Sequence, residues 1–442
     1  MTDESLYPQP ALRRLARVRE FLLSFGVLHT GNTALNILYS LALLLVVSRV
    51  LPPDRYAQIV FFTAISLYFQ PLDQALGRVL FAQLRIGIVR KAADQQNVIL
   101  MLGAQLVLLS LAAIVIPIAA ASWQGTTQDT TNVAGNSLYL FFALLMNFWA
   151  FDLQSTGFAL DLSPRFVRWS LLHRFCQFGA LGVLWITADF NQFAFIAAAL
   201  FSAFTAFACA CISRHVKIEA WSWSGKQWEV RARSLGTSLM SGLSDLLALN
   251  LPYAVISMAY GVGSALVIFD TVMKLARLTM AGSRTLTEIG LPRHSRLVLE
   301  QDTASANRLF NQIVMLCVAA SAIPATVVLF DAPFVFSLLL GPNNVVPAQA
   351  GIATGFIILA TGLYQPASLL MSFANDYVAI RRFTILAGVL AALFFVAVIA
   401  LKAGPLEILW IYAIVLTLSG IGAVVLGQRS PYPLVVVDDT AS

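Results

Sequence analysis

Residues 263–290 read GSALVIFDTVMKLARLTMAGSRTLTEIG, and this stretch decides how the chain is built. It is long enough to cross a membrane, yet it contains three basic side chains. Alternating steps of four and three residues along a helix place the charged positions on one face. That face holds Asp270, Lys274, Arg277, Ala281, Arg284 and Glu288. The segment is therefore predicted to be a helix with one ionic stripe and an otherwise apolar surface.

The composition of the whole chain is that of a membrane protein. Of its 442 residues, 59% are hydrophobic and 11% are charged, whereas about 25% of a soluble domain is charged. The four cysteines lie inside apolar runs, and neither metal-type spacing nor a Walker loop occurs. We expect no enzyme, no cofactor, no metal and no nucleic-acid partner.

Continuous apolar runs of about 20 residues predict membrane-spanning helices, and their lack of alternation disfavours a membrane barrel. We expect an all-α membrane protein of about twelve transmembrane helices without a soluble globular domain. The predicted spans are 22–48, 57–83, 98–122, 137–160, 167–188, 193–212, 235–259, 263–290, 309–330, 348–374, 384–401 and 408–427.

Lysine and arginine are concentrated in every second loop. The N-terminal tail carries Arg13 and Arg14, for example, whereas segments 122–136 and 331–347 carry no basic residue. Because cytoplasmic loops are enriched in such residues, we expect both termini in the cytoplasm of a multi-pass bacterial inner-membrane protein. The alternative, that 263–290 is an amphipathic surface helix, would reverse this bias in every later loop.

A polar segment near the middle separates six predicted spans from six others. Many transporters are built from two such halves. The predicted organisation is a cytoplasmic tail (1–21), a six-helix bundle (22–212), a cytoplasmic linker (213–234), a second six-helix bundle (235–427) and a cytoplasmic C-terminal tail (428–442).

The membrane-embedded charges indicate where function lies. A charge at the bilayer centre costs about 2.5–3.5 kcal/mol, so the ionic stripe is expected to face a water-filled cavity or paired partners. Polar stripes in the first, second and seventh spans predict that the first two helices of each half line this cavity. Its predicted cations suit an elongated anion such as a pyrophosphate. They are Arg78, Lys274, Arg277 and Arg284. The alternative is a structural ion network, with Asp270–Lys274 and Arg284–Glu288 as pairs.

The acidic and neutral polar residues of these helices receive separate roles. We expect ion coupling or gating, by H⁺ or Na⁺, from Asp73, Asp245, Asp270 and Glu288. Contacts with sugars are expected from Asn32, Asn36, Tyr39 and Gln74. Asp245 is the best coupling candidate, since no basic residue lies near it at helical spacing. Its alternative role is a serine-satisfied polar group between packed helices.

The turn after the first span carries a familiar pattern. Arg49-Val-Leu-Pro-Pro-Asp-Arg-Tyr-Ala, followed by Leu72–Asp73 and Gly77, resembles the polysaccharide transporter family of the multidrug/oligosaccharidyl-lipid/polysaccharide exporter superfamily. Ala57 stands where that family commonly has glycine. The resemblance implies a V-shaped fold of two six-helix bundles and structural roles for Arg49 and Tyr56.

The same resemblance implies a flippase that moves undecaprenyl-pyrophosphate-linked oligosaccharide repeat units across the inner membrane for O-antigen or exopolysaccharide synthesis. Its partners would be membrane lipids, a polysaccharide polymerase and glycosyltransferases. Two other functions remain open. One is a cation-coupled multidrug exporter of the same superfamily, which the cations of 263–290 disfavour. The other is a membrane glycosyltransferase or polymerase, which the scarcity of acidic residues in the outer loops disfavours.

Overall fold

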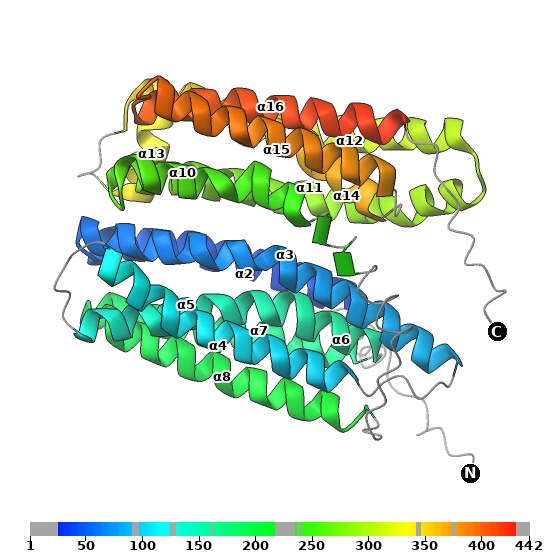
Figure 1. Cartoon of the computed structure of the whole chain (residues 1–442), viewed down its shortest axis with the longest axis horizontal. Helices are drawn as coiled ribbons and strands as arrows, with labels where there is room; N and C mark the ends of the chain where they lie inside the picture. Colours follow the sequence, from blue (N-terminus) through cyan, green and yellow to red (C-terminus); the bar gives the residue numbers. More distant parts are fainter. Residues whose placement is uncertain are drawn as a thin grey trace, which may run out of the picture. The chain divides into compact units, whose positions relative to one another are not determined.

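The computed structural model describes residues 25–90, 97–123, 130–160, 162–216, 235–236, 239–240, 242–341, 346–373 and 377–429. Within these ranges the regular structure is entirely helical (Figure 1). The elements are α2 (Phe25–Val50), α3 (Pro53–Arg90), α4 (Asn97–Trp123), α5 (Thr130–Phe148), η2 (Trp149–Leu153), α6 (Gln154–Ala159), α7 (Ser163–Thr187), α8 (Phe190–Ser213), η3 (Leu246–Asn250), α10 (Leu251–Tyr260), α11 (Ser264–Leu299), α12 (Thr303–Phe330), α13 (Ala332–Leu340), α14 (Ala348–Phe373), α15 (Tyr377–Ala400) and α16 (Pro405–Arg429).

Within the described residues, each predicted span coincides with a helix, or with a helix interrupted by a π-helical turn. In the described part of the chain, nine helices are long and apolar enough to cross a membrane. The predicted spans 22–48, 167–188 and 263–290 correspond to α2, α7 and α11, which are helical but fall outside that set. Polar and charged residues along α7 and α11 lower their mean hydropathy, and the described apolar part of α2 is short. The predicted cytoplasmic position of both termini stays a prediction.

The described residues form two compact units. Unit 1 comprises residues within 1–43 and 80–222, and unit 2 comprises residues within 44–79 and 223–442. The division passes through α2 and α3, because the end of α2 and the start of α3 make hydrogen bonds to elements of unit 2. The predicted halves 22–212 and 235–427 stay a prediction. Both tails and most of the 213–234 linker lie outside the described residues.

The core of unit 1 is aromatic. Phe142 of α5 contacts Phe193 and Phe201 of α8 with ring centroids 6.4 and 5.1 Å apart. Trp149 of η2 also stacks on His173 of α7, with ring centroids 6.2 Å apart. Such offset and edge-on pairs stabilise a core beyond the area they bury. These contacts fix α5, α7 and α8 against one another.

Helix α14 is the central helix of unit 2 and packs against α11, α12 and α16 (Figure 1). Its apolar window is 72% buried, the largest share among the candidate spans of the described chain. Close packing depends on Gly362, where a Cβ atom would lie 2.5 Å from Ser321 Oγ and 3.1 Å from the Cys317 carbonyl oxygen. Small residues at helix interfaces allow this approach within a membrane.

Helix α13 lies in the segment predicted as the bare outer loop 331–347, so it is an element that the sequence reasoning missed. The end of α2 covers its C-terminus. Arg49 Nη2 donates to the Leu338 carbonyl oxygen at 2.7 Å, and Ser48 Oγ donates to that of Leu339 at 2.9 Å. These carbonyl groups have no partner within α13, so the two side chains cap the helix. A structural role of Arg49 was expected from the turn motif, and the hydrogen bond to Leu338 is a contact through which it would act.

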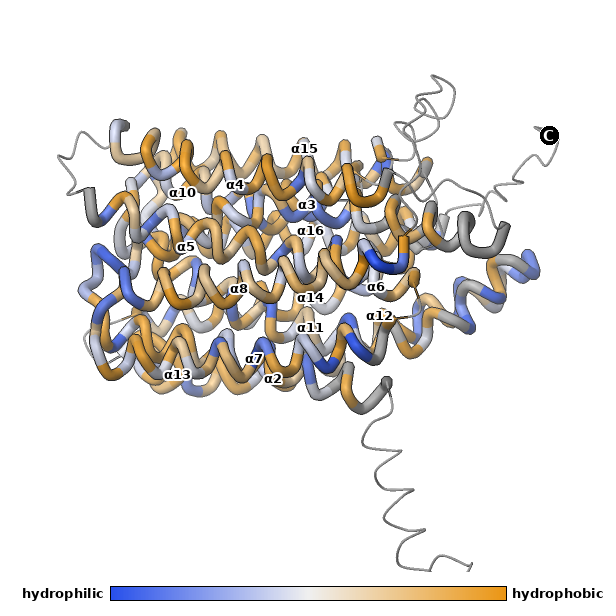
Figure 2. The backbone as a smooth tube through the Cα atoms, turned by 90° about the horizontal axis from the view of Figure 1, so that it is seen from below, coloured by the Kyte–Doolittle hydropathy of each residue, from blue (hydrophilic) through white to orange (hydrophobic). Residues whose placement is uncertain are grey.

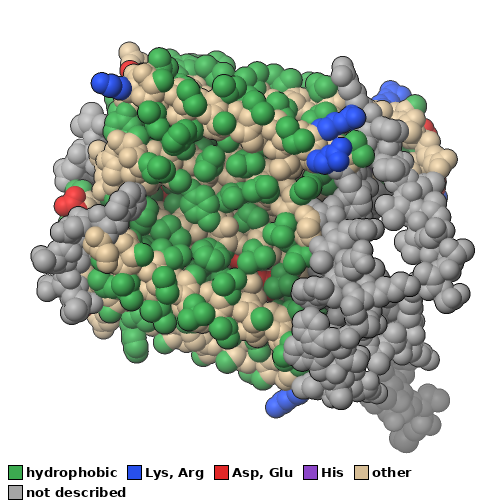
Figure 3. All heavy atoms as spheres, viewed as in Figure 1, with side chains coloured by type: hydrophobic (Ala, Val, Ile, Leu, Met, Phe, Trp, Pro, Cys, Tyr) green, Lys and Arg blue, Asp and Glu red, His purple; other side chains and the backbone are tan. Residues whose placement is uncertain are grey.

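Apolar side chains dominate the exterior that Figure 3 shows, and Lys and Arg side chains lie toward its margins. Exposed residues include Ile186, Met315 and Phe330. Hydrophobic residues likewise predominate along the helices in Figure 2. An exterior of this kind requires lipid rather than water around the helices.

Helix α11 has 36 residues and is therefore about 54 Å long. A hydrocarbon core is about 30 Å thick, so the end of α11 extends beyond it. There Arg296 pairs with Glu300 at 2.8 Å. Asp302 then caps α12, and hydrogen bonds from the side chain and backbone of Ser305 lower the pKa of its carboxyl group.

Candidate substrate and ion-coupling site

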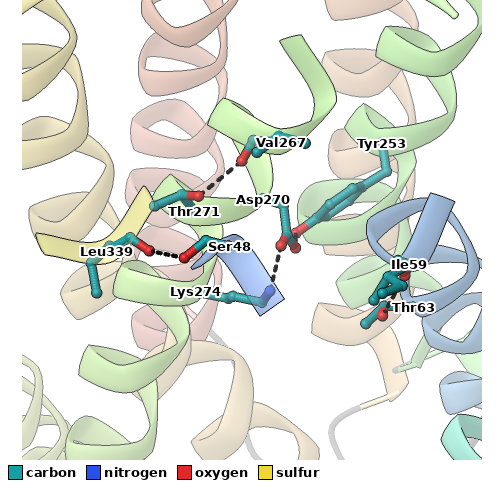
Figure 4. Close-up of polar contacts among 9 residues, drawn as sticks. All are labelled: Ser48, Ile59, Thr63, Tyr253, Val267, Asp270, Thr271, Lys274 and Leu339. Atoms are coloured by element: carbon teal, nitrogen blue, oxygen red, sulfur yellow. Dashed lines mark hydrogen bonds and ion pairs between the residues drawn. The ribbon is translucent and has the colours of Figure 1, made fainter. Parts of the chain in front are cut away.

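A buried ion pair lies in the first half of α11. Lys274 Nζ is 2.6 Å from Asp270 Oδ2, and the two side chains are 20% and 1% exposed. The Tyr253 hydroxyl group of α10 donates to Asp270 Oδ1 at 3.0 Å. Figure 4 shows the carboxylate between these two donors. The predicted Asp270–Lys274 pair is therefore present, and each charge compensates the other where solvent is scarce.

Two tyrosine rings surround this pair. Lys274 Nζ lies 5.8 Å from the ring centroid of Tyr56, and the Arg277 guanidinium lies 5.4 Å from that of Tyr253. Cations over aromatic faces are attracted by the ring quadrupole. The cluster is thus aromatic as well as ionic, and Tyr56 contacts the charged stripe in addition to belonging to the turn motif.

Arg277 has a partner that the sequence did not suggest. Its Nη2 donates to Asn250 Oδ1 at 3.0 Å. Asn250 is the last residue of η3, and its Nδ2 also donates to the Leu67 carbonyl oxygen of α3 at 3.4 Å. One asparagine therefore connects α3 to the ionic face of α11.

The helix around Asn250 is interrupted. Pro252 has no N–H group, so the Ala248 carbonyl oxygen accepts a hydrogen bond from the Tyr412 hydroxyl instead, at 3.1 Å. Two residues on, the Tyr68 hydroxyl donates to the Asn250 carbonyl oxygen at 2.9 Å and accepts from Ala254 N–H at 3.0 Å. Irregular backbone at membrane depth requires such replacement partners. π-Helical turns are frequent at functional sites.

Asp245 directly precedes η3 and is half-buried. It accepts a hydrogen bond from the Tyr364 hydroxyl at 2.6 Å and one from Ser368 Oγ at 3.4 Å. Both donors come from the central helix α14 and are one turn apart. The serine contact agrees with the alternative role of Asp245 as a polar group satisfied between packed helices. The tyrosine contact adds a short hydrogen bond to the Asp245 carboxylate.

The structure does not gather all the predicted site residues. Arg284 is exposed and lies about 10 Å along α11 from Arg277. Asp73 is fully buried and Gln74 half-buried, both in unit 2. The side chains of Arg78 and Glu288 lie outside the described residues, so the predicted Arg284–Glu288 pair stays a prediction.

The three remaining sugar-contact candidates belong to unit 1. Asn32 is half-buried, Asn36 is exposed and Tyr39 is buried. Unit 2 supplies four site residues that the sequence reasoning missed. They are Tyr68, Asn250, Tyr253 and Tyr364. Only the sequence Asn-Leu-Pro at 250–252, a polar residue and a proline inside an apolar run, signalled an interruption.

Comparison with known proteins gives no match to any family model and none to a curated protein sequence. Solved structures do match over nearly the whole chain. The inward-facing conformation of a multidrug resistance MATE family transporter of the MOP superfamily superposes with a TM-score of 0.71 at 15% identity, covering 88% of this chain and 93% of that one. The chain has the MATE transporter fold.

Two further transporter structures also match over most of the chain. One is the outward-facing conformation of a multidrug resistance MATE family transporter, with a TM-score of 0.64 and 15% identity. The other is a MOP superfamily transporter from Pyrococcus furiosus, with a TM-score of 0.64 and 14% identity, whose binding pocket is described as of reverse polarity, suggesting a different function. Each match covers 90% of this chain and 92% of the other. These proteins are transporters rather than enzymes.

Proposed function

We propose that this chain is an exporter of amphipathic organic compounds in the bacterial inner membrane, working by alternating access and driven by cation entry. The observation that supports it is the nearly full-length likeness to multidrug MATE transporters. The sequence favoured a polysaccharide flippase over this function because of three cations in 263–290. Two of them, Lys274 and Arg277, have partners that reduce their availability to an anionic substrate.

Asp245 is the proposed coupling group. Its carboxylate is half-buried next to η3 and accepts hydrogen bonds from Tyr364 and Ser368 of α14. Binding of H⁺ or Na⁺ at its carboxylate would change the hydrogen bond from Tyr364, which comes from the central helix α14. Intramembrane carboxylates that face other helices are the usual elements of such coupling.

A second candidate is the flippase for undecaprenyl-pyrophosphate-linked oligosaccharides, with a polymerase and glycosyltransferases as partners. The observation that favours it is the shared face of Lys274, Arg277 and Arg284 on α11. The Pyrococcus furiosus transporter has the same fold together with a binding pocket of reverse polarity. The same fold therefore occurs with binding pockets of different polarity.

Transport by the purified chain separates the two candidates. Proteoliposomes with an imposed Na⁺ or proton gradient are loaded with ethidium, a fluorescent cationic amphiphile, or with a short-chain lipid-linked oligosaccharide. Gradient-dependent movement of ethidium supports the exporter, and gradient-stimulated movement of the oligosaccharide alone supports the flippase. Movement of neither probe contradicts both.

The coupling role has a matched pair of variants. Asp245→Asn should abolish stimulation by the gradient, while Asp302→Asn, which alters an exposed carboxylate and retains a side chain suited to an N-cap, should transport like the wild type. Equal gradient stimulation in the two variants would remove Asp245 from the mechanism.

A further inference from the structure

Unit 1 contains an arginine in the middle of a membrane helix, and the site in unit 2 does not use it. Arg174 is the twelfth residue of α7 and lies about 17 Å from the start of that helix. Its Nη1 donates to Gln177 Oε1 at 2.7 Å, whereas its Nε atom is buried without a hydrogen-bond partner. Among the described residues, no carboxylate forms an ion pair with Arg174.

A second unsatisfied donor lies beside it. Tyr39 of α2 is 2% exposed, and its hydroxyl oxygen has no hydrogen-bond partner in the described part of the chain. The Tyr39 ring packs edge-on against Phe178 at 5.6 Å, and Phe178 is one helical turn after Arg174, on the same face of α7. The ring contact thus brings α2 and α7 together where each carries a buried, unsatisfied donor.

The chemistry of these donors selects an oxygen anion. The guanidinium fork matches a carboxylate or phosphate group, and a phenol O–H adds a third donor. Gln177 holds one nitrogen of the fork, so the fork has a fixed orientation before a ligand binds. Bilayer headgroups lie about 15 Å from the bilayer centre, whereas Arg174 lies near the middle of α7. An anion that binds Arg174 therefore belongs to a molecule that enters unit 1.

We propose that Arg174 and Tyr39 form a subsite for the phosphate or carboxylate group of the transported amphiphile. This rests on the proposed export function and adds compounds with an anionic group, zwitterions included, to the substrates that the exporter would bind. The subsite supplies an uncompensated cation, which the paired Lys274 does not.

Binding to the full chain in phosphatidylcholine nanodiscs tests the proposal, with dodecyl phosphate as probe and calorimetry as readout. Arg174→Gln should raise the Kd about tenfold or more, and Tyr39→Phe about threefold. Arg168→Gln removes an exposed arginine of the same helix and should leave the Kd unchanged. Dodecyltrimethylammonium should bind all four proteins alike.

Three results would overturn the subsite. One is an unchanged Kd in Arg174→Gln, and another is equal weakening in Arg168→Gln. The third is binding of inorganic phosphate as tight as that of dodecyl phosphate, which would indicate a simple ion site. If Arg174→Gln does not accumulate, Arg174→Lys takes its place, because it keeps the charge without the guanidinium fork. An unchanged Kd in both Arg174→Lys and Tyr39→Phe would then overturn the subsite.

The binding measurement uses no gradient, so it fails separately from the export function. Arg174-dependent binding without any transport in proteoliposomes would contradict the export function and leave the subsite in place. Gradient-driven transport with binding that is independent of Arg174 would contradict the subsite alone.

Discussion

The hydroxyl group of Tyr68 replaces one backbone hydrogen bond of α10, because it lies between the Asn250 carbonyl oxygen and the Ala254 N–H group. In an uninterrupted helix these two backbone groups would bond each other. The tyrosine comes from α3, so movement of α3 along α10 has to break both contacts. Release of Tyr68 would leave these two backbone groups free to pair directly, so we expect the segment to have a second hydrogen-bonded state.

Removal of this hydroxyl group should favour the state without the α3 contact. Tyr68→Phe should lower stability by about 1–2 kcal/mol and slow transport, since one of the two states of the cycle loses its hydrogen bonds. The measurements are the thermal unfolding midpoint in detergent and the initial transport rate. Tyr260→Phe, at the exposed end of α10, is the control. Wild-type values for both quantities in Tyr68→Phe would show that the bridge has no role.

The Asp270–Lys274 pair should behave as a unit. Asp270→Asn leaves Lys274 largely buried without its counter-charge, which should cost on the order of 3 kcal/mol. Lys274→Gln should be similarly harmful, whereas the double variant should recover most of the lost stability, because no uncompensated charge remains. Unfolding midpoints and the amount of protein in the membrane measure this. Additive losses in the double variant would show that the two side chains act separately.

The packing of α14 gives a prediction with an internal control. Gly362→Ala places a methyl group against Ser321 and the Cys317 carbonyl oxygen, and should destabilise the protein by about 1–3 kcal/mol. Gly282→Ala on α11 has open space around the added atom and should stabilise by up to about 1 kcal/mol, through helix propensity. Equal unfolding midpoints for the two variants would contradict the close contact of α12 with α14.

The helices were predictable from the sequence because a helix surrounded by lipid needs a long apolar run. Such a run can be recognised without knowing which helices pack against it. The spacing of the charged positions predicted a helix over 263–290, which α11 confirms, whereas its crossing of the membrane stays a prediction. Helix α13 was missed because nine residues are too few to register as a span. The π-helical turns were missed because they depend on partners from other helices, such as Tyr412 and Tyr68.

The candidate site was predictable only where its partners lie on one helix. The Asp270–Lys274 pair follows from a spacing of four residues, whereas the bond of Arg277 to Asn250 joins residues 27 positions apart. Likewise, Asp245 meets Tyr364 across 119 residues. Tyrosine and asparagine within apolar runs are compatible with ordinary packing, so their type does not reveal which charged group they contact.

The role of Arg277 in transport can be tested by substitution. Its guanidinium is held by Asn250 and Tyr253 rather than by an acid, so its removal leaves no unpaired carboxylate. Arg277→Ala should therefore leave the protein in the membrane, while loss of the hydrogen bond between α11 and η3 should reduce transport about tenfold or more. Arg277→Lys should restore little, because an ammonium group does not reproduce the planar fork.

The control for this prediction is Arg284→Ala, which removes an exposed cation from the same face of α11 and should reduce transport less than about threefold. Asn250→Ala should resemble Arg277→Ala, since it frees the guanidinium from η3. Transport rates per molecule of membrane-inserted protein make the comparison independent of expression. If Arg277→Ala transports at the wild-type rate, the stripe has a structural role only, and the cations of α11 do not select the substrate.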